Sequence, residues 1–326
     1  MRYLQAGFPP YFTKNFFQSH WQVTQKCNFH CAYCVNEEQR RDGIHMSPEI
    51  MRAALGMIAG LSRPSYRFSL SGGEVTLYPH LEDMLSSIAT LFPAGTVVTM
   101  LSNGSASPRR MRALLSLAPT LQCRFIITIH PGQTRVSDLI EKLLSFSPEE
   151  RKNWFHLKLV APPQESHIKK IRTQLDAAGI FHYSVHAVMD FATGKLAEGY
   201  KKESLSLLAP SNGRKEYFSY RHVTEHGEKD VTFLEGLWHD MFHYTGMFCS
   251  AGYQSIYLDE YGHVSKGQFC GRMPYTILEK NPFTDPQFIT PMRCTEPHCT
   301  CTPYTSLPKW RNDSYAPAWS GMEHNG

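Results

Sequence analysis

Short runs of β-branched and aromatic residues alternate with helix-like stretches up to about residue 210, and this alternation is the strongest constraint on the fold. The expected strands lie at residues 20–24, 66–71, 96–102, 123–130, 154–160 and 181–189. The expected helices run from Pro48 to Leu61, His80 to Leu91, Pro108 to Leu117, Val136 to Ser145 and Ser166 to Ala178. Two of them have good starts, because Ser47 and Ser107 offer an N-cap oxygen directly before a proline. Successive strand–helix units predict a parallel α/β sheet.

The side chains within the strands indicate that this sheet is curled. A parallel sheet with helices on both faces should be apolar on both faces. Here one face is apolar and the other polar, with Tyr66, Phe68 and Leu70 opposing Arg67, Ser69 and Ser71 in the second strand. We therefore expect an α/β fold, a partial (β/α)6 barrel resembling a TIM barrel. Its polar inner wall should hold the site, with chemistry at the carboxyl ends of the strands.

The composition indicates in which cellular compartment the protein lies and which classes of partner it can bind. No apolar run approaches the ~20 residues that a membrane-spanning helix needs, and the first residues lack the pattern of a signal peptide. We therefore expect the nine cysteines to lie in a reducing compartment and the protein to be cytoplasmic, without a membrane partner. The net charge of +4 is small and the basic pairs are scattered, which disfavours a nucleic-acid partner.

Three cysteines directly after the first expected strand, Cys27, Cys31 and Cys34, have a C-x3-C-x2-C spacing. Thiolates are the ligands that select iron–sulfur clusters or zinc. A four-iron cluster held by three thiolates keeps one iron open for chemistry, whereas a structural zinc ion would need a fourth ligand such as His30. The three cysteines alone leave both interpretations open.

Two further motifs stand at the ends of expected strands. Ser71-Gly72-Gly73-Glu74 follows the second strand, and its glycines allow the backbone to bend sharply and to approach a ligand closely. Leu101-Ser102-Asn103-Gly104 ends the third strand. Either motif alone is also compatible with an ordinary turn.

In register over residues 20 to 104, these features resemble the signature of the radical S-adenosylmethionine (SAM) enzymes. In that family the open iron of a 4Fe-4S cluster chelates SAM, and an electron from the cluster cleaves SAM to a 5′-deoxyadenosyl radical. The resemblance implies that Cys27, Cys31 and Cys34 hold this cluster. It also implies SAM contacts from Tyr33, Gly72, Gly73, Glu74, Ser102, Asn103 and Val160. An electron donor such as flavodoxin or ferredoxin is then an expected partner.

Five more cysteines lie near the C-terminus: Cys249, Cys270, Cys294, Cys299 and Cys301. Two short strands around Gly262 predict a hairpin that brings Cys249 and Cys270 together. The set resembles the SPASM or twitch extension of radical SAM enzymes, which holds an auxiliary 4Fe-4S cluster. We expect Cys249, Cys270, Cys299 and Cys301 as ligands, with Cys294 as the alternative. A zinc knot that staples a small domain is the other use of such thiols.

We divide the chain into an irregular lead-in at 1–18, a radical SAM barrel at 19–210 and an auxiliary-cluster extension at 211–326. The candidates for substrate handling are His130, Lys158 and His186 on the inner wall, together with Asp190 and the SAM-proximal Glu74, and each of these could instead be a hydrogen-bonded core residue. Cys294, if spare, could return a hydrogen atom to a substrate radical, which completes the catalytic candidates.

The combined features predict a radical SAM enzyme that abstracts a hydrogen atom from an unactivated carbon, leading to oxidation, epimerisation or bond formation, with the second cluster assisting electron transfer. Because so few residues precede the first strand, we expect no leader-binding domain and prefer a small-molecule or short-peptide substrate. An RNA-modifying radical SAM enzyme is the alternative within the superfamily. The alternative from another class is a non-catalytic zinc or iron–sulfur scaffold that binds a partner.

Overall fold

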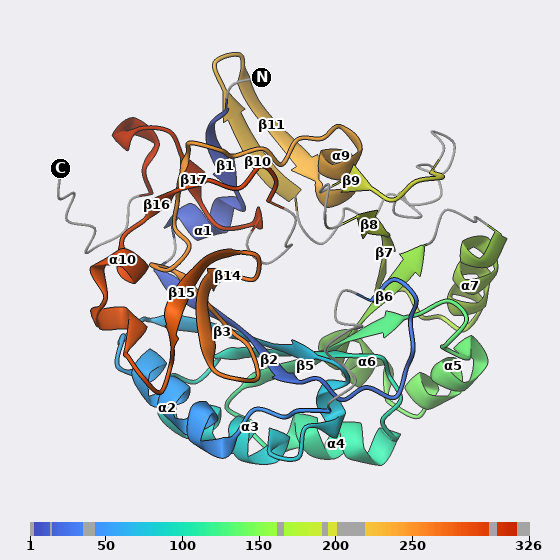
Figure 1. Ribbon diagram of the computed structural model, residues 1–326. Helices are drawn as coiled ribbons and strands as arrows, with labels where there is room; N and C mark the ends of the chain where they lie inside the picture. Colours follow the sequence, from blue (N-terminus) through green and yellow to red (C-terminus); the bar gives the residue numbers. More distant parts are fainter. Residues whose placement is uncertain are drawn as a thin grey trace.

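A curved sheet of nine strands dominates the computed structural model, which describes residues 3–13, 15–34, 43–161, 166–190, 195–200, 219–299 and 305–317 (Figure 1). The strand order is β15-β14-β13-β2-β3-β4-β5-β6-β7. Seven strands run parallel: β2 (Phe16–Thr24), β3 (Ser65–Gly72), β4 (Val97–Ser102), β5 (Gln122–Ile129), β6 (Phe155–Ala161), β7 (Tyr183–Ala187) and β13 (Ser255–Leu258). β14 (His263–Gly267) and β15 (Cys270–Thr276) extend the β13 edge in antiparallel fashion. In the described chain the sheet is open between β7 and β15, as a partial barrel requires.

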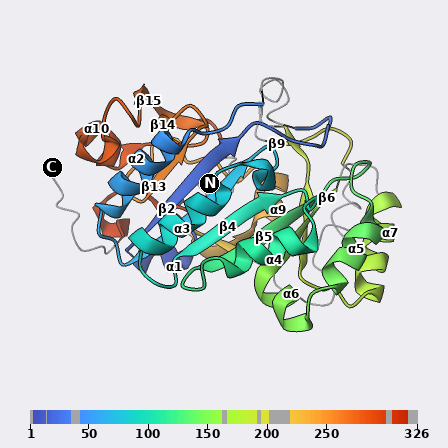
Figure 2. The ribbon, with the colours of Figure 1, turned by 90° about the horizontal axis from the view of Figure 1, so that it is seen from below.

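Helices cover the outer face of this sheet, as Figures 1 and 2 show. They are α2 (Pro48–Ala59), α3 (Leu81–Leu91), α4 (Pro108–Ser116), α5 (Val136–Leu144), α6 (Pro148–Trp154) and α7 (Ser166–Ala177). The predicted caps are present, since Ser47 Oγ accepts from the Ile50 amide and Ser107 Oγ accepts from the Arg110 amide. The sequence analysis missed α6, although Ser147 and Glu150 form a capping box at its start.

The two faces of the barrel strands differ as predicted. In β5 and β6 every second side chain is buried, including Phe125 and Leu157, and the intervening ones are half-buried. The buried side chains belong to one continuous core with the outer helices. Ile256 and Leu258 from β13 and Val264 from β14 are part of the same core, so the C-terminal hairpin extends the barrel wall.

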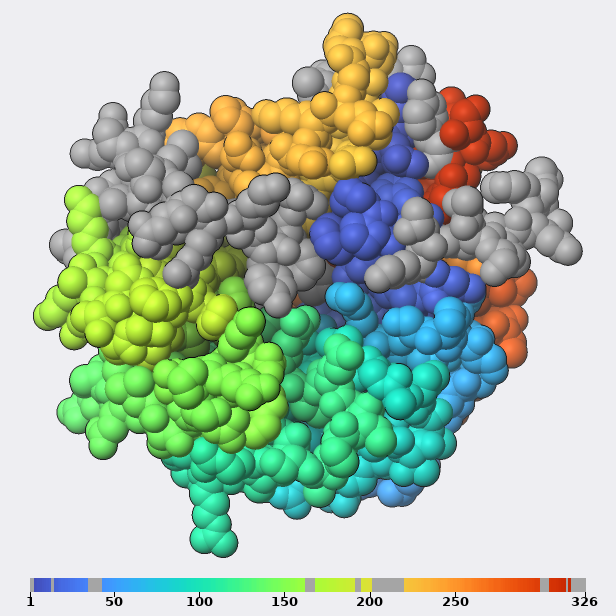
Figure 3. All heavy atoms as spheres, turned by 180° about the vertical axis from the view of Figure 1, so that it is seen from behind, coloured from blue at the N-terminus to red at the C-terminus, as the bar shows by residue number. Residues whose placement is uncertain are grey.

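A second, six-stranded sheet has the order β11-β10-β1-β17-β12-β16. Its strands are β1 (Tyr3–Gly7), β10 (Ser219–Thr224), β11 (Gly227–Thr232), β12 (Phe248–Cys249), β16 (Met292–Arg293) and β17 (Lys309–Trp310). From behind, Figure 3 shows the dark blue N-terminal residues against the orange segment that holds β10 and β11. The expectation of an irregular lead-in at 1–18 is therefore wrong. These residues form β1, α1 (Pro9–Thr13) and the start of β2. The reason is that Tyr3 and Ala6 are buried in one apolar cluster with Tyr220 and Phe242, which lie far away in the sequence.

The remaining elements of the described residues are short. β8 (Met189–Asp190) and β9 (Lys195–Leu196) form a two-stranded ribbon after β7. Two further helices are α9 (Phe233–Trp238) and α10 (Pro286–Ile289), and three 3-10 turns are η2 (Val75–Leu77), η4 (Pro282–Thr284) and η5 (Asp313–Tyr315). Among the helices that the structure describes, none has the length and apolarity to cross a bilayer.

Candidate active site

The three N-terminal cysteines lie on one short loop at the carboxyl end of β2. Cys31 is buried, while Cys27 and Cys34 are half-buried. The Phe29 amide donates to Cys27 Sγ at 3.4 Å, and the Cys34 amide donates to the Cys31 carbonyl at 3.1 Å, which forms a turn between the last two cysteines. Burial, and secondarily the neighbouring Cys31, raises the pKa of Tyr33 on the same turn. The loop thus presents three soft donors and partial access to solvent, a donor set that fits an iron–sulfur cluster.

The Gly72-Gly73 pair packs directly against the segment that leads into this loop. The Gly73 amide donates to the Thr24 carbonyl at 2.7 Å, and the Glu74 amide donates to the Lys26 carbonyl at 2.8 Å. Gly72 has φ +127°, and a Cβ atom there would lie 2.1 Å from the Thr24 oxygen. At Gly73 a Cβ atom would lie 2.2 Å from the Lys26 oxygen. Only glycine allows this approach, so the pair fixes the end of β3 beside the cysteine loop.

The side chain of Glu74 joins the ends of β3 and β4. It is fully buried, and its Oε1 accepts from Thr76 Oγ1 at 2.6 Å and from Ser102 Oγ at 2.7 Å. Its Oε2 accepts from the Asn103 amide at 2.6 Å. The predicted contact of Glu74 with SAM stays a prediction, because the carboxylate is engaged with the protein itself.

Asn103 connects β4 to the cysteine loop. Its Nδ2 donates to Asn28 Oδ1 at 2.8 Å and lies 3.9 Å from Cys27 Sγ. Its Oδ1 accepts from the Ser105 amide at 2.9 Å, which orients the side chain. The structure therefore brings together the three motifs that the sequence placed on separate strands: the cysteine loop, the Gly-Gly-Glu segment and the Ser102-Asn103 strand end.

His130, at the end of β5, contacts the cysteine loop from the opposite side. Its Nδ1 lies 3.0 Å from Tyr33 Oη, and the two rings stack with centroids 5.9 Å apart. Phe29 meets the same imidazole edge-on at 6.0 Å. His130 is thus a neighbour of the predicted cluster site, where it can orient Tyr33 or exchange a proton with a bound molecule.

The other inner-wall candidates lie on β6 and β7. In the strand register Lys158 is beside Thr128 and Ser184, and Val160 is beside His186. Ser184 Oγ lies 2.8 Å from both His156 Nε2 and His186 Nε2. Asp190, by contrast, is exposed on the β8–β9 ribbon.

Burial lowers the pKa values of the inner-wall histidines, and the positive charge of Lys158 lowers them further. The pKa of His156 falls to about 4, and that of His186 falls well below its usual value. His20, on β2, also has its pKa lowered to about 4 for the same two reasons, and its Nε2 lies 2.7 Å from Ser71 Oγ. These rings are therefore neutral near pH 7. The sequence analysis did not select His20 or His156, although both occupy the polar face of their strands.

The four C-terminal thiols that the structure describes, Cys249, Cys270, Cys294 and Cys299, lie near enough to influence one another electrostatically. Burial raises the pKa of Cys270, and the neighbouring Cys249, Cys299 and Cys294 raise it further. Burial and then Cys249 raise the pKa of Cys294 to about 11. Backbone hydrogen bonds hold Cys294 and Cys299 in position. The Cys294 amide donates to the Met247 carbonyl at 2.8 Å, and the Cys299 amide donates to the Phe242 carbonyl at 2.9 Å. Cys294 therefore belongs to the group, whereas Cys301 lies outside the described residues.

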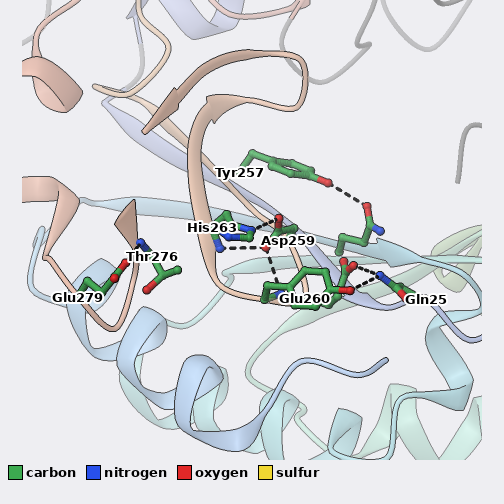
Figure 4. A network of polar contacts seen from close by, with 9 residues as sticks. Gln25, Tyr257, Asp259, Glu260, His263, Thr276 and Glu279 are labelled. Carbon is green, nitrogen blue, oxygen red and sulfur yellow. Dashed lines mark hydrogen bonds and ion pairs between the residues drawn. The ribbon is translucent and has the colours of Figure 1, made fainter. Parts of the chain in front are cut away.

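A network of hydrogen bonds joins the β13–β14 hairpin to the end of β2, which leads into the cysteine loop (Figure 4). Gln25, two residues before Cys27, donates from Nε2 to the Glu260 carboxylate and to Tyr261 Oη at 3.3 Å. Tyr257 Oη donates to Gln22 Oε1 at 2.9 Å. Burial raises the pKa of Glu260. The predicted hairpin is present, and its tip supports the base of the cysteine loop.

Comparison with known proteins gives one family match. Residues 21–153 match the model described as the radical SAM superfamily. GTP 3',8-cyclase of Stenotrophomonas maltophilia strain K279a is 28% identical over 89 residues, which are 27% of this chain and 27% of that protein. GTP 3',8-cyclase 1 of Pseudomonas aeruginosa strain PAO1 is 35% identical over 95 residues, 28% of each chain. The chain thus spans little more than a quarter of the length of the curated relatives that it matches.

Two solved structures share the fold over most of the chain. Native anSMEcpe with bound AdoMet has a TM-score of 0.57 at 14% identity, covering 83% of this chain and 81% of that one. Streptococcus suis SuiB bound to precursor peptide SuiA has a TM-score of 0.55 at 14% identity, covering 86% of this chain and 67% of that one. At this level of identity the likeness concerns the fold.

Proposed function

Because residues 21–153 match the radical SAM superfamily model, we propose that the protein is a radical SAM enzyme whose 4Fe-4S cluster is held by Cys27, Cys31 and Cys34. The observation that carries this proposal is the convergence of the cysteine loop, Gly72-Gly73 and Ser102-Asn103 at neighbouring strand ends. When bound, the cluster and SAM supply a 5′-deoxyadenosyl radical that abstracts a hydrogen atom from an unactivated carbon. Reduced flavodoxin or ferredoxin is the proposed electron donor.

The chain's own residues would position SAM. Gly72 and Gly73 hold the backbone of β3 against the cysteine loop, and Glu74 fixes that backbone relative to β4. Tyr33, Ser102, Asn103 and Val160 are the other proposed contacts. His130 orients Tyr33 through the 3.0 Å contact and is the group best placed to hold or move a proton near the cysteine loop.

We propose that residues 211–326 add an auxiliary 4Fe-4S cluster to the barrel at 19–210. The gathering of Cys249, Cys270, Cys294 and Cys299 supports these four as ligands, in place of the expected set with Cys301. Soft thiolates in a group of four suit a fully ligated cluster. If Cys294 is a ligand, it is not available as a hydrogen-atom donor.

The inner wall favours a substrate that carries an anionic group. The described bounds of β2 to β7 contain no Asp or Glu, whereas Arg67, Arg124 and Lys158 lie on their polar faces. A wall with one sign of charge attracts the opposite charge into the barrel. We therefore propose a small molecule or short peptide with a carboxylate or phosphate, anchored by Lys158 on β6, with His186 two residues beyond its register neighbour Ser184 on β7. The fold shared with SuiB, whose structure holds a precursor peptide, is compatible with either class.

Anaerobic reconstitution with iron and sulfide tests this function. The wild-type chain should bind about eight irons, as two four-iron clusters require, and should cleave SAM to 5′-deoxyadenosine when reduced. Cys31→Ala should lose about half of the iron and all of the cleavage. Cys123→Ala is the matched control, because Cys123 is a buried core thiol whose pKa burial raises to about 11. A wild-type chain that takes up only zinc, or a Cys31→Ala chain that still cleaves SAM, would contradict the proposal.

A further inference from the structure

A group of nitrogen and oxygen ligands lies apart from the thiols, at Asp240, His243 and His298. In the part of the chain that the structure describes, this is the one set of three such residues whose ligand atoms lie within 4.8 Å of one another. The group borders an open cavity of about 570 Å³, which is also lined by Asp190, Lys195 and Leu196 of the β8–β9 ribbon and by Glu198 after it. The site therefore faces a space of the size that small ligands use.

The hydrogen bonds of His243 orient its Nε2 toward the Asp240 carboxylate. His243 Nδ1 lies 2.8 Å from the Pro297 carbonyl oxygen, which can only accept, so Nδ1 carries the proton. Nε2 then has a lone pair in the neutral ring, yet it lies 2.7 Å from Asp240 Oδ1, which is another acceptor. A proton shared between these two atoms satisfies the contact at this distance, and a metal ion that both atoms bind would take the place of that proton. A ring whose far nitrogen donates to a backbone carbonyl is the usual arrangement of a metal-bound histidine.

The backbone fixes His298 beside His243. Hydrogen bonds from Cys294 to Met247, from Gly246 to Cys294 and from Cys299 to Phe242 hold the segment 294–299 along the segment 242–247. The two imidazoles lie with centroids 4.7 Å apart at an angle of 62°. Asp240 has a φ of +51°, the left-handed region that few residues other than glycine adopt, as it turns the chain after α9. All three side chains thus come from restrained segments.

We propose that Asp240, His243 and His298 bind a divalent transition-metal ion of the zinc or iron(II) class. Two histidines and one carboxylate are a typical ligand set for these ions. Two ligands of one ion lie at most about 4.2 Å apart, twice a zinc–nitrogen bond, so small side-chain rotations close the present spacing. Three protein ligands leave coordination positions open toward the cavity, where an oxygen or nitrogen group of a small molecule can bind.

The positive charge of Lys195 opposes metal binding, which provides a further variant for the test. Its Nζ lies 3.5 Å from Asp240 Oδ2, on the carboxylate oxygen that does not face His243. The lysine therefore reduces the negative charge available to an ion. Lys195→Met removes this competing charge and should tighten metal binding severalfold.

Zinc titration of the full chain, already loaded with its iron–sulfur clusters under anaerobic conditions, tests the proposal. Wild type should bind one further zinc ion, while Asp240→Asn and His243→Ala should each bind zinc at least ~10-fold more weakly with unchanged iron content. His226→Ala is the control, because His226 is an exposed histidine beside Glu225 on another turn. This result is independent of SAM cleavage, so it can fail while the proposed function stands.

Two outcomes would overturn the metal site. The first is a loaded wild-type chain that takes up no zinc. The second is equal zinc affinity in wild type, Asp240→Asn and His243→Ala. Using both variants guards against a folding defect in one of them, which the iron content would reveal.

Discussion

Single residues at the strand ends determine the geometry around the cysteine loop, and Glu74 is the clearest case. Its position directly after Gly72-Gly73 suggested a contact with SAM. That contact stays a prediction, and in the structure the carboxylate accepts hydrogen bonds from Thr76, Ser102 and the Asn103 backbone, all within a fully buried space. The residue therefore acts through Asn103, which holds Asn28 and approaches Cys27.

Glu74→Gln should weaken SAM binding while the first cluster remains. A glutamine side chain has only one accepting oxygen, so at least one buried donor loses its partner at a cost of ~1–3 kcal/mol. We expect a lower melting temperature in thermal unfolding and a larger dissociation constant for SAM in equilibrium dialysis of the reconstituted chain. The iron content should stay at the wild-type value.

The control for this variant is Glu82→Gln, which removes an exposed carboxylate that pairs with Arg110. It should leave both measured quantities near the wild-type values, because exposed ion pairs contribute little. If Glu74→Gln binds SAM as tightly as wild type, the positioning role of Glu74 is wrong.

For single residues near the cysteine loop, the sequence alone predicted which side chains matter but not which residues they contact. The glycine pair was selected for close backbone approach, and the structure places it against Thr24 and Lys26. The pairing of His20 with Ser71, and of His156 with Ser184, depends on which strands are neighbours and on the direction of each side chain. Spacing within one strand does not contain that information.

The helices and strands of the barrel could be predicted because their signals are local. Caps at Ser47 and Ser107, and the alternation within β3, β5 and β6, lie within a few residues of the features that they specify. β1 could not be predicted in the same way, because its partners β10 and β17 are supplied by the other end of the chain. The same reason explains why β13 was expected in a separate extension, although it pairs with β2.

The loop between β16 and β17 allows a test of the auxiliary ligands. Cys294, at the end of β16, lies with Cys249, Cys270 and Cys299, so Cys294→Ser should lose about four of the eight irons and leave the first cluster intact. Cys301→Ser is the comparison and should keep all of the iron. Iron analysis and the visible absorbance of the reconstituted chains measure both. Loss of iron from Cys301→Ser alone would restore the ligand set expected from sequence.

Across the whole molecule, the two sheets do not follow the division at residue 210. The main sheet takes β13, β14 and β15 from beyond that residue, and the second sheet takes β1 from the N-terminus. The side chains of Ile256 and Leu258 lie in the same core as Phe68 and Phe125 of the barrel. The separate parts at 1–18, 19–210 and 211–326 thus remain a proposal about function, while the packing joins them.

This shared core predicts that the chain unfolds as one unit. Ile256→Ala, which removes a fully buried side chain on β13, should cost ~2–5 kcal/mol and should shift a single transition of the cluster-free chain, whether followed by tryptophan fluorescence or by circular dichroism. Leu278→Ala is the control, because Leu278 is 46% exposed in the same C-terminal segment. Two separate urea transitions, with Ile256→Ala moving only one of them, would mean that the C-terminal region folds independently. We expect coincident transitions because β2 pairs with β13 on one side and with β3 on the other. If the C-terminal hairpin detached, β2 would become an unpaired edge strand of the barrel sheet.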